Sequence, residues 1–245
     1  MIKIGLNDIK GFKSILSVAE TILTEVKFEL DNDGLRFRGM DGGHTSYFEA
    51  DFKKDCFLSY DLDEIDSIII DTHDMNTILK RVKNTDDATI IINDDVLTIQ
   101  VLSDGNEKSF KLNSIDMEYD SPNMPLIEYP VSADVDFNKF KDNVMDANLY
   151  DDRLRVKIEE NNLIIHNKSM IGSYESKLQL DEDYQGNLNS VFSMNLISKF
   201  LKLSTLSNNV EISLGSDMPI LFTLVDDFGD ITIKLLIAPI IEEDY

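Results

Sequence analysis

Short runs of alternating apolar and polar residues make up most of this chain, and they come in pairs separated by two to four turn-forming residues. Such pairs occupy 26–40, 89–102, 156–167 and 222–237. Alternation with a period of two predicts strands, and connections this short predict antiparallel hairpins. Most of the chain is therefore predicted to form meandering antiparallel sheets.

Four segments break this alternation, because their apolar residues recur every three or four positions, as in an α-helix. In the first, Phe12, Ile15, Leu16 and Ala19 keep this period, and Asp8 precedes them as a candidate N-cap. Each segment has one apolar face suited to a sheet and one polar face left over. The predicted helices span 8–23, 71–83, 136–149 and 192–206.

The order strand, helix, strands, helix, strands occurs twice, which suggests an internal repeat. At an offset of 128 residues, Asp8, Phe12 and Lys13 recur as matching residues. The connecting stretch EYDSPNMPLIEYP holds three of the five prolines, where regular structure is hard to sustain. We therefore predict an α+β fold with an N-terminal domain at 1–117, a connector at 118–129 and a similar C-terminal domain at 130–245.

The composition limits the class of protein. Apolar residues make up 42% of the chain, which is enough to bury a core. The single cysteine, Cys56, excludes an intrachain disulfide, and no apolar run is long enough to span a bilayer or to form a signal peptide. We therefore expect a soluble, intracellular protein with no membrane partner.

Charge is distributed unevenly. The chain has 46 acidic and 23 basic residues, a formal net charge of −23, which ordinarily argues against nucleic acid as a partner. The four predicted helices, however, hold nine cations and seven acids, whereas the rest of the chain holds 14 cations and 39 acids. The excess of acid therefore lies almost wholly outside the helices.

The helix cations avoid the apolar faces and lie among polar residues such as Ser, Thr and Asn, on faces that carry no aromatic residue. A surface of this kind contacts the phosphate backbone, whereas reading of single strands needs aromatic side chains for stacking. The alternative is that these cations have no ligand, and that lysine is frequent on the outer faces of the helices because it is a good helix former. We predict that the helices share one basic surface for double-stranded DNA, without sequence preference, made of Lys10, Lys13, Lys80, Arg81, Lys83, Lys139, Lys141, Lys199 and Lys202.

Three stretches of the sequence also match a known family. They are FRGMDGGHTSYFEADF at 37–52, DMNTILKRV at 74–82 and LLIAPIIEEDY at 235–245. With them, the whole chain resembles proliferating cell nuclear antigen, the DNA sliding clamp of archaea and eukaryotes, with the archaeal form favoured. Two departures are Glu20 and Asp142, which stand where a cation facing the pore is common in the family.

The resemblance implies a ring of three identical or different chains, with antiparallel sheets outside and two helices from each domain lining the hole. Such a ring encircles duplex DNA, confers processivity on the replicative DNA polymerase, and needs no cofactor, no metal and no catalysis. Implied partners are DNA polymerase, clamp loader, flap endonuclease and DNA ligase, which dock through short apolar peptide motifs. The implied location is the cytoplasm, with the nucleoid, in an archaeon, or the nucleus in a eukaryote.

The resemblance also implies a partner-peptide groove on the outer face. Its expected walls are Met40, His44, Tyr47, Met124, Pro125, Leu126, Pro219, Leu236, Ile237, Ala238, Pro239 and Ile240. The ring is expected to close by pairing of two exposed edge strands, at 106–114 and 173–180. The expected subunit-interface residues on these strands are Lys108, Phe110, Lys111, Tyr174, Ser176 and Lys177.

Two other classes of function remain as alternatives. One is an acidic, β-rich interaction scaffold whose helices pack against a protein and do not bind DNA; the charge of the helices disfavours it. The other is a metal-dependent enzyme that uses the many carboxylates. The sequence contains no complete metal-ligand or catalytic motif to support this second alternative.

Overall fold

The computed structural model describes residues 1–62, 66–181, 184 and 187–241. The last four residues of the matching C-terminal stretch, 242–245, thus lie outside the described residues. The chain divides into two compact units. The first contains Met1–Asn123 together with Phe228–Ile233, and the second contains Met124–Asp227 and the chain from Lys234 on. The domain boundaries predicted at 117 and 130 stay predictions.

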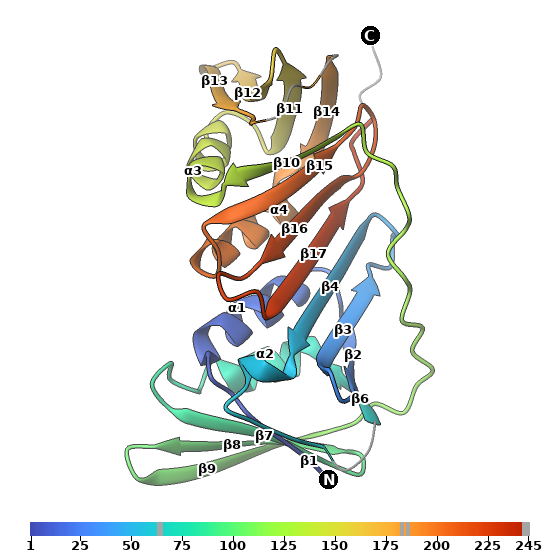
Figure 1. Ribbon diagram of the computed structural model, residues 1–245, viewed down its shortest axis with the longest axis vertical. Coiled ribbons are helices and arrows are strands. Elements are labelled where there is room, and N and C mark those ends of the chain that lie inside the picture. Colours follow the sequence, from blue (N-terminus) through green and yellow to red (C-terminus); the bar gives the residue numbers. More distant parts are fainter. Residues whose placement is uncertain (63–65, 182–183, 185–186, 242–245) are drawn as a thin grey trace. The chain divides into compact units, whose positions relative to one another are not determined.

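The first unit has two antiparallel sheets with helices α1 and α2 (Figure 1). Its strands are ordered β5-β1-β7-β8-β9 in one sheet and β4-β3-β2-β6 in the other. Its elements are β1 (Ile2–Gly5), α1 (Ile9–Ala19), β2 (Glu25–Leu30), β3 (Gly34–Met40), β4 (Ser46–Lys53), the 3-10 turn η1 (Lys54–Cys56), β5 (Ser59–Leu62), β6 (Asp66–Asp71), α2 (Thr72–Leu79), β7 (Asp87–Asn93), β8 (Val96–Ser103) and β9 (Asn106–Asn113).

The second unit repeats this plan with the strand orders β10-β15-β16-β17 and β13-β12-β11-β14. Its elements are β10 (Val131–Asp136), α3 (Phe137–Ala147), β11 (Arg153–Glu159), β12 (Asn162–Ser169), β13 (Gly172–Gln179), β14 (Leu188–Ser193), α4 (Met194–Phe200), the 3-10 turn η2 (Leu201–Thr205), β15 (Asn209–Leu214), β16 (Ile220–Val225) and β17 (Ile231–Ile237). The first residues of β17, Ile231–Ile233, are counted with the first unit.

Apart from β5, the strands of the first unit have counterparts in the same order in the second. The order β1-β7-β8-β9 matches β10-β15-β16-β17, and β4-β3-β2-β6 matches β13-β12-β11-β14. The helix starts match as well, because Asp8 accepts from the Gly11 N–H and Asp136 from the Lys139 N–H, both at 2.9 Å. These bonds satisfy backbone donors that a helix start leaves unpaired. The internal repeat predicted from the sequence is therefore present in the fold.

Each unit has its own aromatic core, formed where the apolar helix faces meet the sheets. In the first unit the ring centroids of Phe12 in α1 and Phe52 in β4 lie 5.6 Å apart. In the second unit the ring centroids of Phe200 in α4 and Phe222 in β16 lie 5.0 Å apart. All four rings are buried, and each contributes roughly 1.5–3 kcal/mol to folding by leaving water. The periodic apolar residues of the predicted helices are thus the core residues.

The helices end earlier than the sequence pattern predicts. α2 ends at Leu79, and the backbone then tightens into a turn in which Arg81 N–H bonds Ile78 O and Val82 N–H bonds Leu79 O. Bonds three residues apart are typical of a helix end. Lys80 is the C-cap, and Arg81 and Lys83 lie beyond the helix. The fourth predicted helix likewise divides into α4 and η2.

Candidate nucleic-acid and protein interfaces

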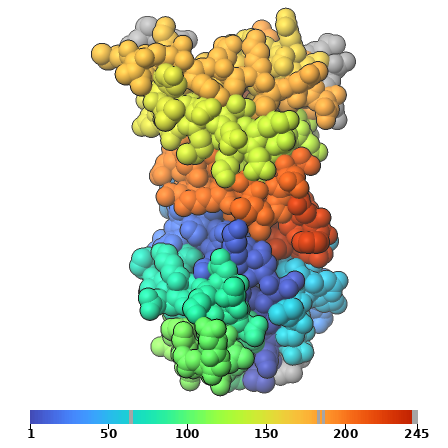
Figure 2. All heavy atoms as spheres, turned by 90° about the vertical axis from the view of Figure 1, so that its left-hand side faces the viewer, coloured from blue at the N-terminus to red at the C-terminus, as the bar shows by residue number. Residues whose placement is uncertain are grey.

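Helices α1 and α2 of the first unit are held side by side by polar contacts along their length. The buried Asn76 amide donates to Leu16 O at 2.9 Å, and the Lys13 ammonium reaches Val82 O at 2.7 Å. His73 lies 2.8 Å from the Glu20 carboxylate. In Figure 2 the blue residues of α1 and the teal residues around the end of α2 form one continuous patch of surface. The polar faces of the two helices thus form one surface.

The predicted cations on this surface differ in solvent exposure and in whether they pair with an acid. Lys10, Lys80 and Arg81 are exposed, and among the described residues they form no ion pair. Lys83 is also exposed, but its ammonium lies 2.8 Å from the Asp104 carboxylate, whose hydrogen bond and charge raise the pKa of Lys83. Lys13 is half-buried and bound to the end of α2. Three of the five cations are therefore available to an outside anion.

The second unit repeats this arrangement with fewer free charges. The Lys141 ammonium donates to Ser204 of η2 at 3.1 Å, as Lys13 does to the end of α2. Lys139 is exposed but lies 3.7 Å from the Asp136 carboxylate, whereas Lys202 is exposed and Lys199 is half-buried. Asp142 and Asp146 are exposed on the same helix, α3. The positive surface is therefore weaker here than in the first unit.

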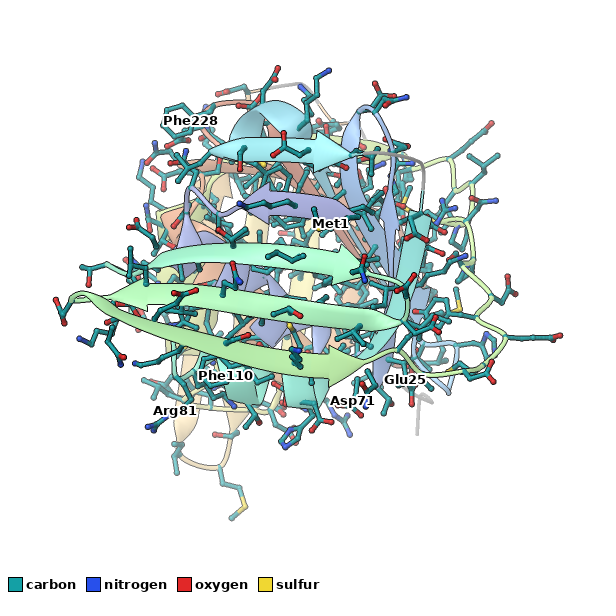
Figure 3. The ribbon with its side chains drawn as sticks, turned by 90° about the horizontal axis from the view of Figure 1, so that it is seen from below. Met1, Glu25, Asp71, Arg81, Phe110 and Phe228 are labelled. Atoms are coloured by element: carbon teal, nitrogen blue, oxygen red, sulfur yellow. The ribbon has the colours of Figure 1, made fainter. Side chains whose placement is uncertain are left out.

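Both strands predicted to form subunit edges lie at sheet edges. In the described part of the chain, β9 pairs only with β8 and β13 only with β12. The two strands are eight residues long and share one pattern of exposure, in which half-buried residues alternate with exposed ones. Figure 3 shows β9 at the end of its sheet, with Phe110 labelled beside it. These two edges leave backbone groups open to a further strand.

The turn before β9 determines which backbone groups are open. Asp104 and Gly105, with φ of 51° and 77°, form a two-residue turn, so that Ser103 and Asn106 are a hydrogen-bonded pair. Hydrogen-bonded pairs alternate along an antiparallel ladder. Phe110, opposite Ile99, therefore directs its N–H to β8. The residues of β9 with open N–H and C=O groups are Glu107, Ser109, Lys111 and Asn113.

The same reasoning applies to β13. The turn at Glu160 and Asn161, with φ of 47° and 63°, makes Glu159 and Asn162 a hydrogen-bonded pair, so the next residue, Leu163, faces β13. The open positions of β13 are Ser173, Glu175, Lys177 and Gln179. Among the predicted interface residues, only Lys111 and Lys177 thus have open backbone groups. The other four, Lys108, Phe110, Tyr174 and Ser176, bond within their own sheets and can offer only side chains.

Two of the predicted groove residues meet in the first unit. The loop after β3 turns at His44, whose φ is 53°. The ring nitrogen Nδ1 of His44 lies 3.2 Å from the sulfur of Met40. Asp41 fixes this loop by accepting from the N–H groups of Thr45 and Ser46. Burial acts to raise the pKa of Asp41, but these hydrogen bonds outweigh burial and the pKa is lowered. The carboxylate therefore stays ionised and the loop keeps its shape near neutral pH.

Three of the predicted groove residues have little or no exposed surface, and their place in a groove stays a prediction. Tyr47, Leu236 and Ile237 are 0%, 7% and 2% exposed. The Tyr47 hydroxyl donates to Glu49, and Leu236 and Ile237 belong to β17. The remaining predicted residues have surface to offer: Leu126 is fully exposed, Pro125 is exposed, and Met124, Pro219, Ala238, Pro239 and Ile240 are half-buried.

Sequence reasoning missed the residue that fixes the start of the predicted connector. The Tyr119 hydroxyl lies 3.2 Å from Glu25 O and 3.1 Å from Arg38 O, so it donates to the backbone of β2 and β3. Burial, followed by the charges of Glu25 and Glu29, raises the pKa of Tyr119 to about 12. A Cβ on Gly39 would lie 2.7 Å from both Leu23 and this hydroxyl. The tyrosine in EYD and the glycine in FRGM were the available signals.

Comparison with known proteins settles the family. A model described as "Proliferating cell nuclear antigen, N-terminal domain" matches residues 1–122. A protein named DNA polymerase sliding clamp from Methanobrevibacter smithii is 30% identical over 244 residues and covers 100% of both chains. Its namesake from Methanothermobacter thermautotrophicus is 29% identical with the same coverage. The chain belongs to the proliferating cell nuclear antigen family of DNA polymerase sliding clamps.

Solved structures show the same fold for members of the proliferating cell nuclear antigen family. The chain matches A. fulgidus PCNA, in a structure with the C-terminal region of FEN-1, with a TM-score of 0.89, 22% identity and 100% coverage of both chains. It matches PCNA from Thermococcus kodakaraensis with a TM-score of 0.87 and 20% identity, covering 98% of this chain and 100% of the other. The predicted clamp fold is therefore confirmed.

Family membership gives the function as that of a DNA sliding clamp, which is a non-catalytic processivity factor. Within the described ranges there is no group of three or more His, Cys, Asp or Glu side chains placed to hold a metal ion. No helix among these residues is long and apolar enough to cross a bilayer.

Proposed function

We propose that three copies of this chain close head to tail into a ring that encircles duplex DNA and tethers the replicative polymerase to it. The observation that carries this proposal is the placement of free cations. Lys10, Lys80 and Arg81 are exposed on the joint α1–α2 surface of a chain whose net charge is −23. A few cations on helices, without aromatic residues, suit weak contact with phosphates of any sequence.

Ring closure is supported by the repeat. Both units have an eight-residue edge strand with the same alternation of exposed and half-buried residues, β9 in the first and β13 in the second. Each of these strands pairs with one neighbour in the described part of the chain, so β9 of one copy can pair with β13 of the next. One heterologous junction used three times covers both open edges.

We further propose that partner proteins dock through short apolar motifs on the exposed part of the predicted groove. The structure of A. fulgidus PCNA with the C-terminal region of FEN-1 supports a flap endonuclease as one such partner. Polymerase, clamp loader and DNA ligase are proposed to use the same groove. The chain itself is proposed to catalyse no reaction and to act in the cytoplasm on the nucleoid.

The test is primer extension by a cognate replicative polymerase on a long singly primed circular template, with clamp loader, ATP and excess trap DNA. The clamp is expected to lengthen the products made in one binding event, and Lys80→Ala with Arg81→Ala is expected to shorten them while the ring stays assembled. The control is Asp55→Asn with Asp87→Asn, which changes two exposed acids away from the helices. If the chain leaves product length unchanged, the acidic scaffold that does not bind DNA becomes the better description.

A further inference from the structure

The sheet β13-β12-β11-β14 of the second unit, seen in Figure 1, has one face that points away from helix α3. The other face meets α3, since the buried Asn167 of β12 donates to Ala147 O at 2.9 Å. Successive side chains of a strand alternate between the two faces of its sheet. The residues that alternate with the buried ones therefore point away from α3. We call this surface the β11–β13 face; it consists of residues 153, 155, 157 and 159 of β11, 162, 164, 166 and 168 of β12, and 173, 175, 177 and 179 of β13.

Cations outnumber acids on the β11–β13 face, although the whole chain has 46 acids and 23 cations. The acids at these positions are Glu159 and Glu175, and none of the positions holds Phe, Tyr or Trp. The five cations are Arg153, Arg155, Lys157, Lys168 and Lys177.

Three of these cations lie near acids, and the face remains net positive when the acid that precedes β11, Asp151, is counted with it. Lys168 is exposed and forms no ion pair among the described residues. The positive charge of this face is therefore reduced but not cancelled by its own acids. The pairs are Arg155–Asp151 at 2.6 Å, Lys157–Glu159 at 3.1 Å and Lys177–Glu175 at 4.0 Å.

His166, on the middle strand of this face, reports the local charge. Its pKa is lowered by burial and then by the charges of Lys157 and Arg155, and the opposite effects of Glu175 and Glu159 do not offset them. The imidazole is therefore neutral near pH 7, and it lies directly opposite Arg155 on one side and Glu175 on the other. The balance of charge felt at the centre of the face is thus positive.

The spacing of the cations indicates the shape of a ligand. Arg153, Arg155 and Lys157 occupy every second residue of β11, and alternate residues of a strand lie roughly 6.6 Å apart. An extended peptide presents its own alternate side chains at the same spacing, so carboxylates at every second position can lie opposite these cations. Stacking of unpaired bases would need an exposed aromatic ring, which these positions lack. The face therefore suits an extended acidic peptide better than single-stranded nucleic acid.

We propose that the β11–β13 face binds an extended acidic segment of a partner protein, with carboxylates at alternate positions. Arginine forms strong, often bidentate hydrogen bonds with carboxylates, and Lys168 on the neighbouring strand can contact an acid beside the row. The face shares no residue with the predicted peptide groove or the predicted DNA surface. The inference therefore goes beyond the proposed function and does not depend on it.

The experiment measures binding of fluorescein-labelled peptides to the whole chain by anisotropy at low and high salt. One peptide is Glu-Thr-Glu-Thr-Glu-Thr-Glu, and a second, Thr-Glu-Glu-Glu-Glu-Thr-Thr, has the same composition with its acids adjacent. A third has Gln in place of each Glu of the first. The test variant is Arg153→Gln with Lys168→Gln. The matched control is Lys3→Gln with Lys54→Gln, which removes two exposed cations from the first unit. Thermal unfolding verifies that both variants fold.

The alternating peptide is expected to bind the native chain about tenfold more tightly than the Gln peptide at low salt, since exposed charge pairs contribute modestly and add over several sites. It should also bind more tightly than the peptide with adjacent acids, because only alternate carboxylates match the spacing of β11. High salt should reduce both preferences. The test variant should lose most of them, whereas the control should keep them. Arg153→Glu with Lys168→Glu should prefer a peptide in which Lys replaces each Glu.

Three outcomes would overturn the inference. If the test variant and the control bind the alternating peptide equally well, the acidic peptide is held elsewhere on the chain. Equal binding of the acidic and Gln peptides to the native chain, or no binding of either, would show that the cations of this face only pair with their own acids. If a single-stranded oligonucleotide of seven thymidines binds more tightly than the alternating peptide and loses affinity in the test variant, the face is a nucleic-acid site.

Discussion

The open edge of β9 offers a sharp test of ring closure, because neighbouring residues on this strand direct their N–H groups oppositely. Ser109 directs its N–H to the open edge, whereas the N–H of Phe110 bonds β8 opposite Ile99. Proline removes the N–H of the residue it replaces. Ser109→Pro should therefore disrupt only the pairing with another copy, and Phe110→Pro should disrupt the sheet of the unit itself.

The magnitude follows from the hydrogen bonds that proline removes. Four open residues on β9, each with one N–H and one C=O, allow about eight hydrogen bonds to a neighbouring strand. Ser109→Pro removes one donor, at a net cost of about 1 kcal/mol, and leaves a buried carbonyl of the partner unpaired for a further 1–3 kcal/mol or so. A total of about 2–4 kcal/mol weakens each junction roughly 30-fold to several-hundred-fold.

The assay is analytical ultracentrifugation over a dilution series, with thermal unfolding measured in parallel. The native chain should sediment as a trimer, Ser109→Pro should shift to monomer at the same concentration with little change in Tm, and Ser109→Ala should stay trimeric. Phe110→Pro should lower the Tm of the monomer. A Ser109→Pro chain that assembles like the native one would refute the assignment of β9 as the joining edge.

Four further outcomes follow from particular contacts. Lys80→Ala with Arg81→Ala should make the slope of log DNA affinity against log salt concentration shallower by about 0.9 for each phosphate that is no longer neutralised, as measured by fluorescence anisotropy. Lys83→Ala alone should change this slope less, because Asp104 already pairs with Lys83. Gly39→Ala should destabilise the chain by roughly 1–3 kcal/mol, since its Cβ would meet Leu23 and Tyr119 at 2.7 Å, while Gly42→Ala, with nothing within 4 Å, should be neutral in thermal unfolding. The pKa of Tyr119 is raised from 10 to about 12, so the hydroxyl's contribution to the free energy of unfolding is present below pH 10 and is lost as the pH rises toward 12. In urea unfolding, Tyr119→Phe should therefore lose less stability between pH 10 and 12 than the native chain does. Ile237→Ser should cost about 2–5 kcal/mol because the side chain is 2% exposed, and equal urea midpoints for this variant and the native chain would show that Ile237 is not a core residue.

The sequence pattern predicted the elements well because period and turn chemistry are local. The apolar residues Phe12, Ile15 and Leu16 that indicated a helix are the ones buried in the first unit. The two edge strands were also predictable, since alternation without a continuous apolar run is typical of a strand that is not buried on both faces. The repeat could be found because Asp8 and Asp136 cap corresponding helices.

The details of the sites were not predictable, because they depend on contacts between segments far apart in sequence. No pattern shows that Lys13 bonds the end of α2 or that Lys83 pairs with Asp104 across to the turn before β9. The burial of Ile237 depends on its neighbours in the sheet, which the sequence pattern does not show. Which N–H of β9 is open depends on the register that the turn at Asp104 sets.

Whether a ring of this chain encloses DNA can be measured by the retention of the clamp on DNA of different topology. The chain is loaded onto a nicked circular plasmid with clamp loader and ATP, isolated by gel filtration in high salt, and followed before and after a restriction enzyme linearises the plasmid. Salt weakens phosphate contacts but does not open a closed ring. A closed ring should stay on the circle and leave the linear DNA by sliding off its ends. Equal loss from both forms, or equal retention on both, would show that the chain does not enclose the DNA.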